Sequence, residues 1–288
     1  MRLTTYASAA DFLACTQAAL EVDEVANNLM LGVAQHLLAD APLIGTAPYL
    51  ATVGDESGLK LVALTEPPYP LTLFCPRPMP GDLNAACELV IRDLLARGLL
   101  VRAVSGRTPL PDHFVGSWKA VTGAGWQLSM HERIYELRRV IPARPVPGRF
   151  RPATQVDADT VAGWAAAFMI EVMPMADPAA AADNARQRIL RGEVYVWEDG
   201  GQPVSMAVTS RPLITSISVS LVYTPPTRRG RGYASACVAA LSQHLLDQGW
   251  QSCSLFADLA NPTSNGIYQK IGYQPVCDFD EYALLEPF

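Results

Sequence analysis

The fold is decided by a stretch in the last third of the chain, Leu221-Val222-Tyr223-Thr224-Pro225-Pro226-Thr227-Arg228-Arg229-Gly230-Arg231-Gly232-Tyr233-Ala234. It closes an alternating run in which Ile217, Val219 and Leu221 share one face and serines the other. That period of two predicts a half-buried β-strand. Pro225-Pro226 ends the strand, because proline has no N–H to give to a ladder.

The loop and the helix that follow favour an anion as ligand. Gly230 and Gly232 lie among three arginines, so backbone N–H groups can approach a ligand that the arginines would also attract. Apolar residues recur at helical spacing from Tyr233 to Gln248, and Gly249 is a favoured residue just past a helix. The first N–H groups of a helix are unpaired and its dipole is positive there, so this arrangement suits pyrophosphate.

Three other interpretations compete at this point. A Walker A loop would need Gly-Lys-Ser/Thr, and the stretch has no such triplet. Gly230-x-Gly232 with Asp258 after the next strand imitates a dinucleotide-binding fingerprint. Against that, the glycines follow the strand only after Pro-Pro-Thr-Arg-Arg, and too little chain remains for a doubly wound sheet. A basic surface turn before an ordinary helix is the plainest alternative.

The same stretch resembles a signature of the GCN5-related N-acetyltransferase (GNAT) superfamily, Arg/Gln-x-x-Gly-x-Gly/Ala, with Arg229, Gly232 and Ala234 at its defining positions. The resemblance implies that the loop cradles the pyrophosphate of acetyl-CoA. It also implies that the end of the preceding strand offers backbone groups to the pantetheine arm and thioester. The cofactor-binding residues implied here are Leu221, Val222, Tyr223, Arg228, Arg229, Gly230, Arg231, Gly232, Tyr233 and Ala234.

A second segment resembles another signature of that superfamily, an asparagine followed seven residues on by a tyrosine in a helix that ends in Gly-Phe or Gly-Tyr. Asn261, Tyr268 and Gly272-Tyr273 stand at those positions. The resemblance implies that Asn261 and Asn265 contact pantetheine or phosphates and that Tyr268 lies beside the sulfur. From the residues alone, Tyr268 would be a packing tyrosine and Asn261 part of a turn. A phenol is protonated at neutral pH, so Tyr268 is the predicted proton donor to the CoA thiolate.

The sequence does not identify a general base. The polar face of the strand before the loop carries Ser216, Ser218 and Ser220, and none of these can take an ammonium proton directly. A water relay, or a remote carboxylate such as Glu171 or Asp258, remains open. The resemblance implies an acceptor pocket built from the first helices and loops of the lobe. Its candidate residues are Phe168, Glu171, Met173 and Met175, which would serve equally well as core or lid.

Two halves of the chain share a layout. Leu94-Leu95-Ala96-Arg97-Gly98-Leu99 parallels Leu245-Leu246-Asp247-Gln248-Gly249-Trp250, and the two glycines are 249 − 98 = 151 residues apart. We infer a duplication with an α/β fold, in which each GNAT-like lobe is a mixed, mostly antiparallel sheet flanked by helices. The proline-rich stretch 141–149 would be a linker between domains 1–140 and 149–288. Two unrelated α/β domains are the alternative.

The first half lacks the glycine pair. Its corresponding loop reads Arg77-Pro78-Met79-Pro80-Gly81-Asp82, with an acid at the predicted start of the helix 83–97. An acid there would repel phosphate, so this lobe is predicted to bind no acetyl-CoA. The strand predicted after that helix covers Leu99 to Val104.

The composition of the chain narrows the classes of protein to which it can belong. The 288 residues are 50% hydrophobic and 17% charged, with a net charge of −6, which disfavours a general nucleic-acid binder. Six dispersed cysteines without Cys-x-x-Cys, and histidines without ligand spacing, predict neither a metal site nor disulfides. The first residues lack an apolar signal region and the sequence has no membrane-length apolar run, so we expect a cytoplasmic protein without a membrane partner.

The predicted activity is acetyl-CoA-dependent acyl transfer. A primary amine, on a small molecule or a peptide, would receive an acetyl or other small acyl group by direct attack in a ternary complex. The alternatives are a non-catalytic acyl-CoA-binding or sensing protein, favoured by the missing base, and a nicotinamide-dinucleotide-binding oxidoreductase. The N-terminal lobe would either wall the acceptor pocket or form a homodimer interface.

Overall fold

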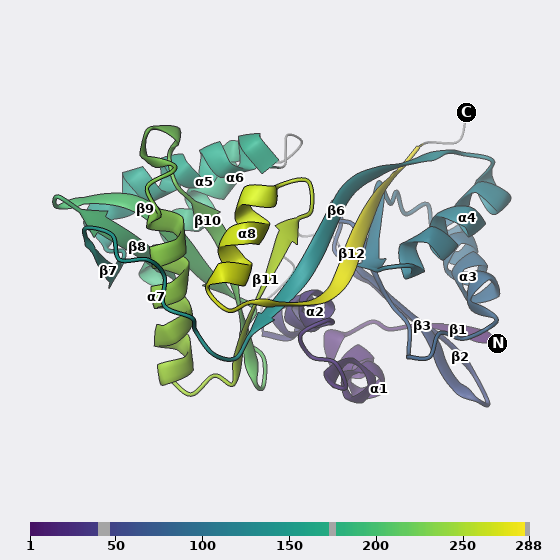
Figure 1. The fold of residues 1–288 in the computed structure, drawn as a ribbon. Helices are drawn as coiled ribbons and strands as arrows, with labels where there is room; N and C mark the ends of the chain where they lie inside the picture. The colour runs from purple at the N-terminus through teal and green to yellow at the C-terminus, as the bar shows by residue number, and fades with distance from the viewer. Residues whose placement is uncertain (40–46, 173–176, 286–288) are drawn as a thin grey trace. The chain divides into compact units, whose positions relative to one another are not determined.

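The computed structural model describes residues 1–39, 47–172 and 177–285. The described residues form two compact units (Figure 1). The N-terminal unit comprises Met1–Ile134, Asp258–Ala260 and Val276–Phe288, and the C-terminal unit comprises Tyr135–Ala257 and Asn261–Pro275. Each unit is a mixed α/β structure.

The N-terminal half contributes six strands and four helices among the described residues. Within its unit the strand order is β1-β2-β3-β4-β5-β12-β6, antiparallel from β1 to β4 and parallel between β4 and β5. The elements are β1 (Arg2–Thr5), α1 (Ala9–Glu21), α2 (Asn28–Ala39), β2 (Tyr49–Asp55), β3 (Gly58–Thr65), β4 (Leu71–Phe74), α3 (Leu83–Ala96), β5 (Ala103–Arg107), α4 (Leu110–Thr122) and β6 (Trp126–Leu137).

The C-terminal half repeats that order of strands and α-helices in its described residues and adds two short 3₁₀ helices. Its unit has the strand order β6-β11-β10-β9-β8-β7. The elements are β7 (Arg149–Pro152), η1 (Gln155–Asp157), α5 (Ala158–Val172), α6 (Pro178–Leu190), β8 (Val194–Asp199), β9 (Gln202–Ser210), β10 (Ser216–Tyr223), η2 (Pro226–Arg228), α7 (Tyr233–Asp247), β11 (Ser252–Asp258), α8 (Pro262–Lys270) and β12 (Gln274–Leu284).

The duplication is visible in the backbone at the ends of α3 and α7. Gly98 and Gly249 both have positive φ, at 64° and 103°. Leu99 N–H bonds to Leu94 O at 3.0 Å, and Trp250 N–H bonds to Leu245 O at 3.3 Å. This is the same glycine C-terminal cap, 151 residues apart, as the two matching hexapeptides predict.

Helices cover both faces of the C-terminal sheet. In Figure 1, α7 and α8 lie in front of this sheet, and α5 and α6 lie behind it. Two separate apolar clusters hold these layers, one around Cys237, Leu241 and Leu255, the other around Val161, Ile189 and Val208. The start of β10 is therefore buried on both faces, with Ser216 and Ser218 each 1% exposed. The prediction of a half-buried strand was wrong there, because helices cover the serine face.

The end of the last strand of each half lies in the other unit: the end of β6 in the C-terminal unit and most of β12 in the N-terminal unit. In the N-terminal unit, β12 pairs antiparallel with β5, from Phe279 opposite Arg107 to Ala283 opposite Ala103. The last residues of β6, from Tyr135, lie in the C-terminal unit, where β6 neighbours β11. The predicted domains 1–140 and 149–288 stay a prediction, since a compact unit is not the same as an independently folding domain.

Other local predictions also need correction. The strand expected at 99–104 is Ala103–Arg107, because the glycine cap and the turn after α3 take up the residues before it. The stretch 141–149 is packed on the C-terminal unit: Ile141 N–H bonds to Ile271 O at 2.8 Å, and Trp197 Nε1 donates to Pro147 O at 2.8 Å. It is therefore not a free linker. Strands β1, β6, β7 and β12 were not predicted.

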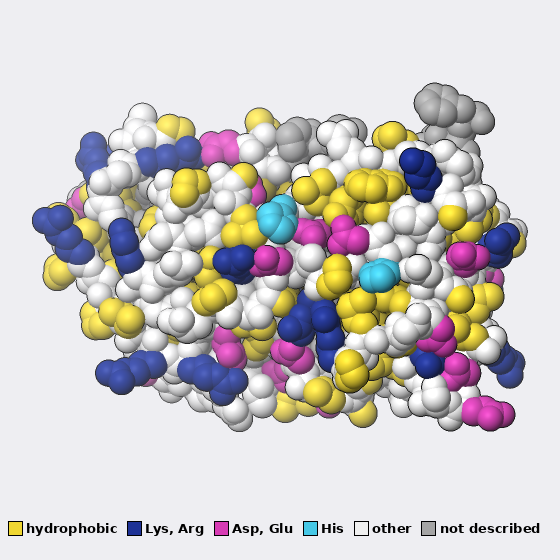
Figure 2. All heavy atoms as spheres, turned by 45° about the vertical axis from the view of Figure 1, so that its right-hand side comes forward, with side chains coloured by type: hydrophobic (Ala, Val, Ile, Leu, Met, Phe, Trp, Pro, Cys, Tyr) yellow, Lys and Arg dark blue, Asp and Glu magenta, His cyan; other side chains and the backbone are white. Residues whose placement is uncertain are grey.

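On the face drawn in Figure 2, the Lys and Arg side chains that the structure describes are scattered, with acidic side chains between them. Within residues 1–39, 47–172 and 177–285, the helices are too short or too polar to span a bilayer.

Candidate acyl-donor site

The end of β10 departs from regular strand geometry. Its parallel ladder with β11 joins Ser216–Ser218 to Ser252–Ser254, and both strands continue beyond it. On the other side, Ser220 faces Val208 of β9 but Tyr223 faces Met206, so β10 carries one extra residue. Leu221 has φ 47°, in the left-handed region. This bulge takes the backbone of Leu221 and Val222 out of the β9 register and leaves its polar groups available to a ligand.

The glycine–arginine loop is built as the sequence predicts. After η2, Gly230 and Gly232 take positive φ, at 75° and 86°, and Gly232 is the N-cap of α7. A side chain at residue 232 would also lie 3.0 Å from Val146 Cγ1. The loop from Arg229 to Gly232 is exposed, and it stands at the N-terminus of a 15-residue helix. An anion reaching the loop would meet unpaired helix N–H groups and the positive end of the dipole.

Tyr233 fastens the start of α7 to the sheet. Its side chain is buried, and its hydroxyl donates to Asp199 Oδ2 of β8 at 2.5 Å. The hydrogen bond to Asp199 raises the pKa of the Tyr233 phenol. Tyr233 therefore positions the helix N-terminus, whereas Ala234 beside it is half-buried and leaves room at the first turn.

Arg229 is engaged within the protein. Its Nη2 lies 2.9 and 2.7 Å from the two carboxylate oxygens of Glu171, and its Nε donates to Thr224 O at 2.8 Å. The guanidinium also lies over the ring of Tyr223, 5.6 Å from the centroid. Arg231 is exposed and Arg228 half-buried. The structure therefore brings all three arginines to the loop, with the Arg229 side chain turned toward α5.

The two carboxylates considered as bases have partners. Glu171, near the end of α5, pairs with Arg229, and the Tyr223 hydroxyl donates to its Oε1 at 3.4 Å. Asp258 Oδ1 accepts from Ala260 N–H at 2.8 Å and so caps a turn. Phe168 packs on the apolar cluster beneath α5. Of the other predicted pocket residues, Met173 and Met175 lie outside the described residues.

Asn261 and Asn265 organise the start of α8. Asn261 is the N-cap, because its Oδ1 accepts from Ser264 N–H at 3.1 Å. Asn265 Nδ2 donates to Asn261 O at 2.8 Å, and Tyr135 Oη donates to Asn265 Oδ1 at 2.7 Å. Tyr135 was missed by the sequence analysis, because no local pattern links a residue of β6 to a helix that begins more than 120 residues later.

Tyr268 lies inside the apolar cluster of the C-terminal unit. It is 7% exposed, and its ring meets Tyr273 edge-on at 6.0 Å. In the described part of the chain its hydroxyl has no hydrogen-bond partner, whereas the Tyr273 hydroxyl bonds to Ser242 Oγ at 2.9 Å. Burial raises the pKa of the Tyr268 phenol to about 12, so the phenol remains a proton donor across the neutral range.

Comparison with known proteins agrees with this architecture. Residues 206–282, which run from β9 to β12, match the family model "FR47-like protein". No curated protein sequence matches the chain at a significant level.

Several solved structures share the whole fold. A GNAT-family acetyltransferase from Colwellia psychrerythraea has a TM-score of 0.62 at 11% identity, covering 99% of this chain and 100% of its own. A GCN5-related N-acetyltransferase from Sphaerobacter thermophilus gives 0.65 at 13%, covering 99% and 96%. A tandem GNAT protein from the clavulanic acid biosynthesis pathway gives 0.61 at 14%, covering 100% and 98%.

Over its full length the fold of this chain is similar to that of these GNAT proteins, the tandem GNAT protein among them. The FR47-like segment contains the glycine–arginine loop, α7, α8 and Tyr268.

Proposed function

We propose that the chain is an acyl-CoA-dependent N-acyltransferase with one donor site, in the C-terminal unit. The observation that carries the proposal is the sequence of bulged strand, glycine–arginine loop and helix N-terminus. The pyrophosphate of acetyl-CoA would bind the N–H groups between Gly230 and Ala234, with Arg228 and Arg231 supplying positive charge.

The pantetheine arm would run along the bulged end of β10. Strand-like N–H and C=O groups there, out of the β9 register, can hydrogen-bond to its amides. The amine nitrogen attacks the thioester carbon, a C–N bond forms, and the oxyanion is stabilised by backbone N–H groups at residues 221–223. The C–S bond then breaks, and the CoA thiolate takes a proton from the Tyr268 phenol. The attacking nitrogen loses its extra proton to water. A water molecule then returns a proton to the Tyr268 phenolate.

The acceptor is a primary amine on a small molecule or peptide. Glu171 lies near the end of α5, and its carboxylate is held by Arg229 of the glycine–arginine loop at 2.7 Å. A negative group there attracts a cationic amine, so we assign Glu171 to acceptor recognition and proton relay through water.

The N-terminal unit has a different loop before its equivalent helix. Asp82 precedes α3 and makes no side-chain cap; its carboxylate lies 3.5 Å from Lys60 Nζ. An acid at a helix N-terminus opposes phosphate binding, so we assign no CoA site to this unit.

The test is a screen for free CoA thiol with acetyl-CoA and a panel of amino acids, polyamines, aminoglycosides and peptides, together with calorimetric CoA binding. We expect Tyr268→Phe to bind acetyl-CoA normally and to lose about a hundred- to ten-thousandfold in turnover. Tyr273→Phe is the matched control: it removes a neighbouring buried hydroxyl and should cost about 1 kcal/mol of stability while turnover persists. Equal turnover in Tyr268→Phe would remove Tyr268 from the mechanism.

A non-catalytic acyl-CoA-binding protein is the second candidate, because both candidate bases have internal partners. Saturable CoA binding without thiol release on any amine would favour it.

A further inference from the structure

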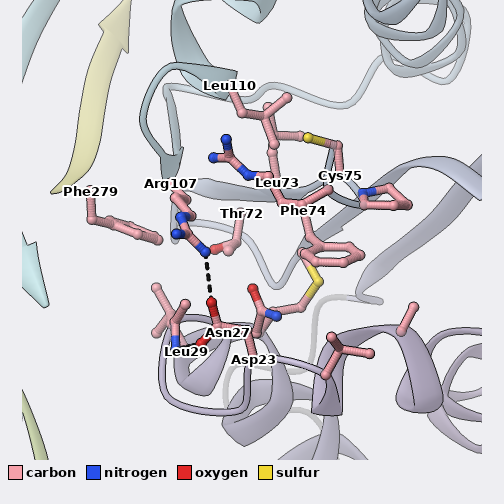
Figure 3. A pocket seen from close by; sticks show the side chains of 16 residues that line it. Asp23, Asn27, Leu29, Thr72, Leu73, Phe74, Cys75, Arg107, Leu110 and Phe279 are labelled. Atoms are coloured by element: carbon pink, nitrogen blue, oxygen red, sulfur yellow. Dashed lines mark hydrogen bonds and ion pairs between the residues drawn. The ribbon is translucent and has the colours of Figure 1, made fainter. Parts of the chain in front are cut away.

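The N-terminal unit contains a pocket of about 520 Å³, at the carboxyl ends of β4 and β5 (Figure 3). The turn between α1 and α2 forms one wall, and the segments after β4 and β5 form the others. The pocket lies wholly within one unit, since Phe279 of β12 belongs to the same unit. Its size is that of a small-molecule site.

Most of the wall is apolar. Leu73 and Phe279 are 3% and 6% exposed, and Phe74 and Leu110 project around the same space in Figure 3. Met30 also lines the pocket. Cys75 also lines the pocket, and burial raises the pKa of its thiol, so it stays protonated and forms part of the apolar wall. A ligand would bury hydrocarbon surface here.

The charges in the pocket are unequal. Arg107 Nη1 pairs with Asp23 Oδ2 at 2.7 Å across the pocket, the dashed line in Figure 3. Arg77 Nη2 donates to Thr108 O at 3.2 Å and has no carboxylate partner among the described residues. Two arginines and one carboxylate thus line the pocket, which leaves one positive charge in excess.

We propose that this pocket binds an apolar monocarboxylate, an aliphatic or aromatic acid, with its carboxylate on Arg77 and Arg107 and its hydrocarbon part against β4 and α2. A guanidinium matches the planar fork of a carboxylate. A phosphate dianion fits less well, because it would exceed the single positive charge and would approach Asp23. CoA also fits less well, since the segment after β4 lacks the glycine pair that a pyrophosphate needs. This inference does not depend on the proposed acyl transfer.

The experiment is titration calorimetry of the full chain with octanoate, octanol and octylamine. We expect saturable octanoate binding that is tighter than that of octanol and octylamine. Arg77→Gln should weaken octanoate binding about tenfold, as for loss of a charged hydrogen bond, and leave octanol binding unchanged. Arg92→Gln on α3 is the control, since Arg92 is exposed, pairs with Glu88 and does not line the pocket.

Two further measurements fix the location. Leu29→Trp enlarges a half-buried pocket residue and should weaken octanoate binding, with circular dichroism checking that each variant is folded. Saturating CoA should leave the octanoate titration unchanged, because the proposed donor site lies in the other unit. Absence of saturable octanoate binding, equal affinity of octylamine, or an unchanged affinity in Arg77→Gln would each overturn the proposal.

Discussion

At the scale of single residues, the contact between Arg229 and Glu171 joins the glycine–arginine loop to α5. The Arg229 guanidinium bonds to the Glu171 carboxylate and to Thr224 O. A pyrophosphate on the loop would compete with Glu171 for the same guanidinium. The two negative groups are therefore coupled through Arg229, and donor binding would release the carboxylate that we assign to the acceptor.

This coupling predicts that Glu171→Gln tightens CoA binding. The pair is half-exposed, at 47% and 42% of the side chains, so its worth is about 0.2–1 kcal/mol, or an affinity gain of up to about fivefold. Calorimetry with CoA measures the gain, and Asp159→Asn on the same helix, whose side chain is 98% exposed, is the control. Unchanged or weaker CoA binding would show that Glu171 does not compete with the pyrophosphate for Arg229.

At the scale of elements, the glycines of the loop serve different purposes. Both have positive φ, which costs a residue with a side chain about 1–2 kcal/mol. Residue 230 faces open space, whereas a Cβ at 232 would press on Val146. We therefore expect Gly230→Ala to lower the free energy of unfolding by that amount only. Gly232→Ala should lower it further and should also weaken CoA binding. Thermal unfolding and CoA titration of the two variants decide this, and equal losses would contradict it.

The sequence predicts elements well where their signals are local. The loop, α7 and the two glycine caps depend on neighbouring residues. In the structure they lie at the positions that the residue spacing predicts. Strands β6 and β12 were missed because their pairing partners are distant in the chain. The contacts of Glu171 with Arg229 and of Tyr135 with Asn265 could not be predicted for the same reason, since each joins two separate elements.

At the scale of the whole molecule, the two halves share an order of elements and differ in their loops. The element order repeats, but only the C-terminal unit has the glycine–arginine loop, and the N-terminal unit has an apolar pocket with two arginines instead. Each half of the chain completes its sheet with a segment of the other.

The exchange predicts that shortening the C-terminus unfolds the opposite lobe. In a chain that ends at Pro275, β5 loses its ladder with β12, and Asp112 loses the hydrogen bond from Tyr282 Oη at 2.6 Å. Amide hydrogen exchange should then show protection lost at 103–107 of β5 and largely kept in β8 and β9, which pair within the C-terminal unit. A chain ending at Leu285 keeps all of β12 and is the control. Protection of β5 in the shorter chain would mean that the N-terminal lobe holds its sheet without the exchanged strand.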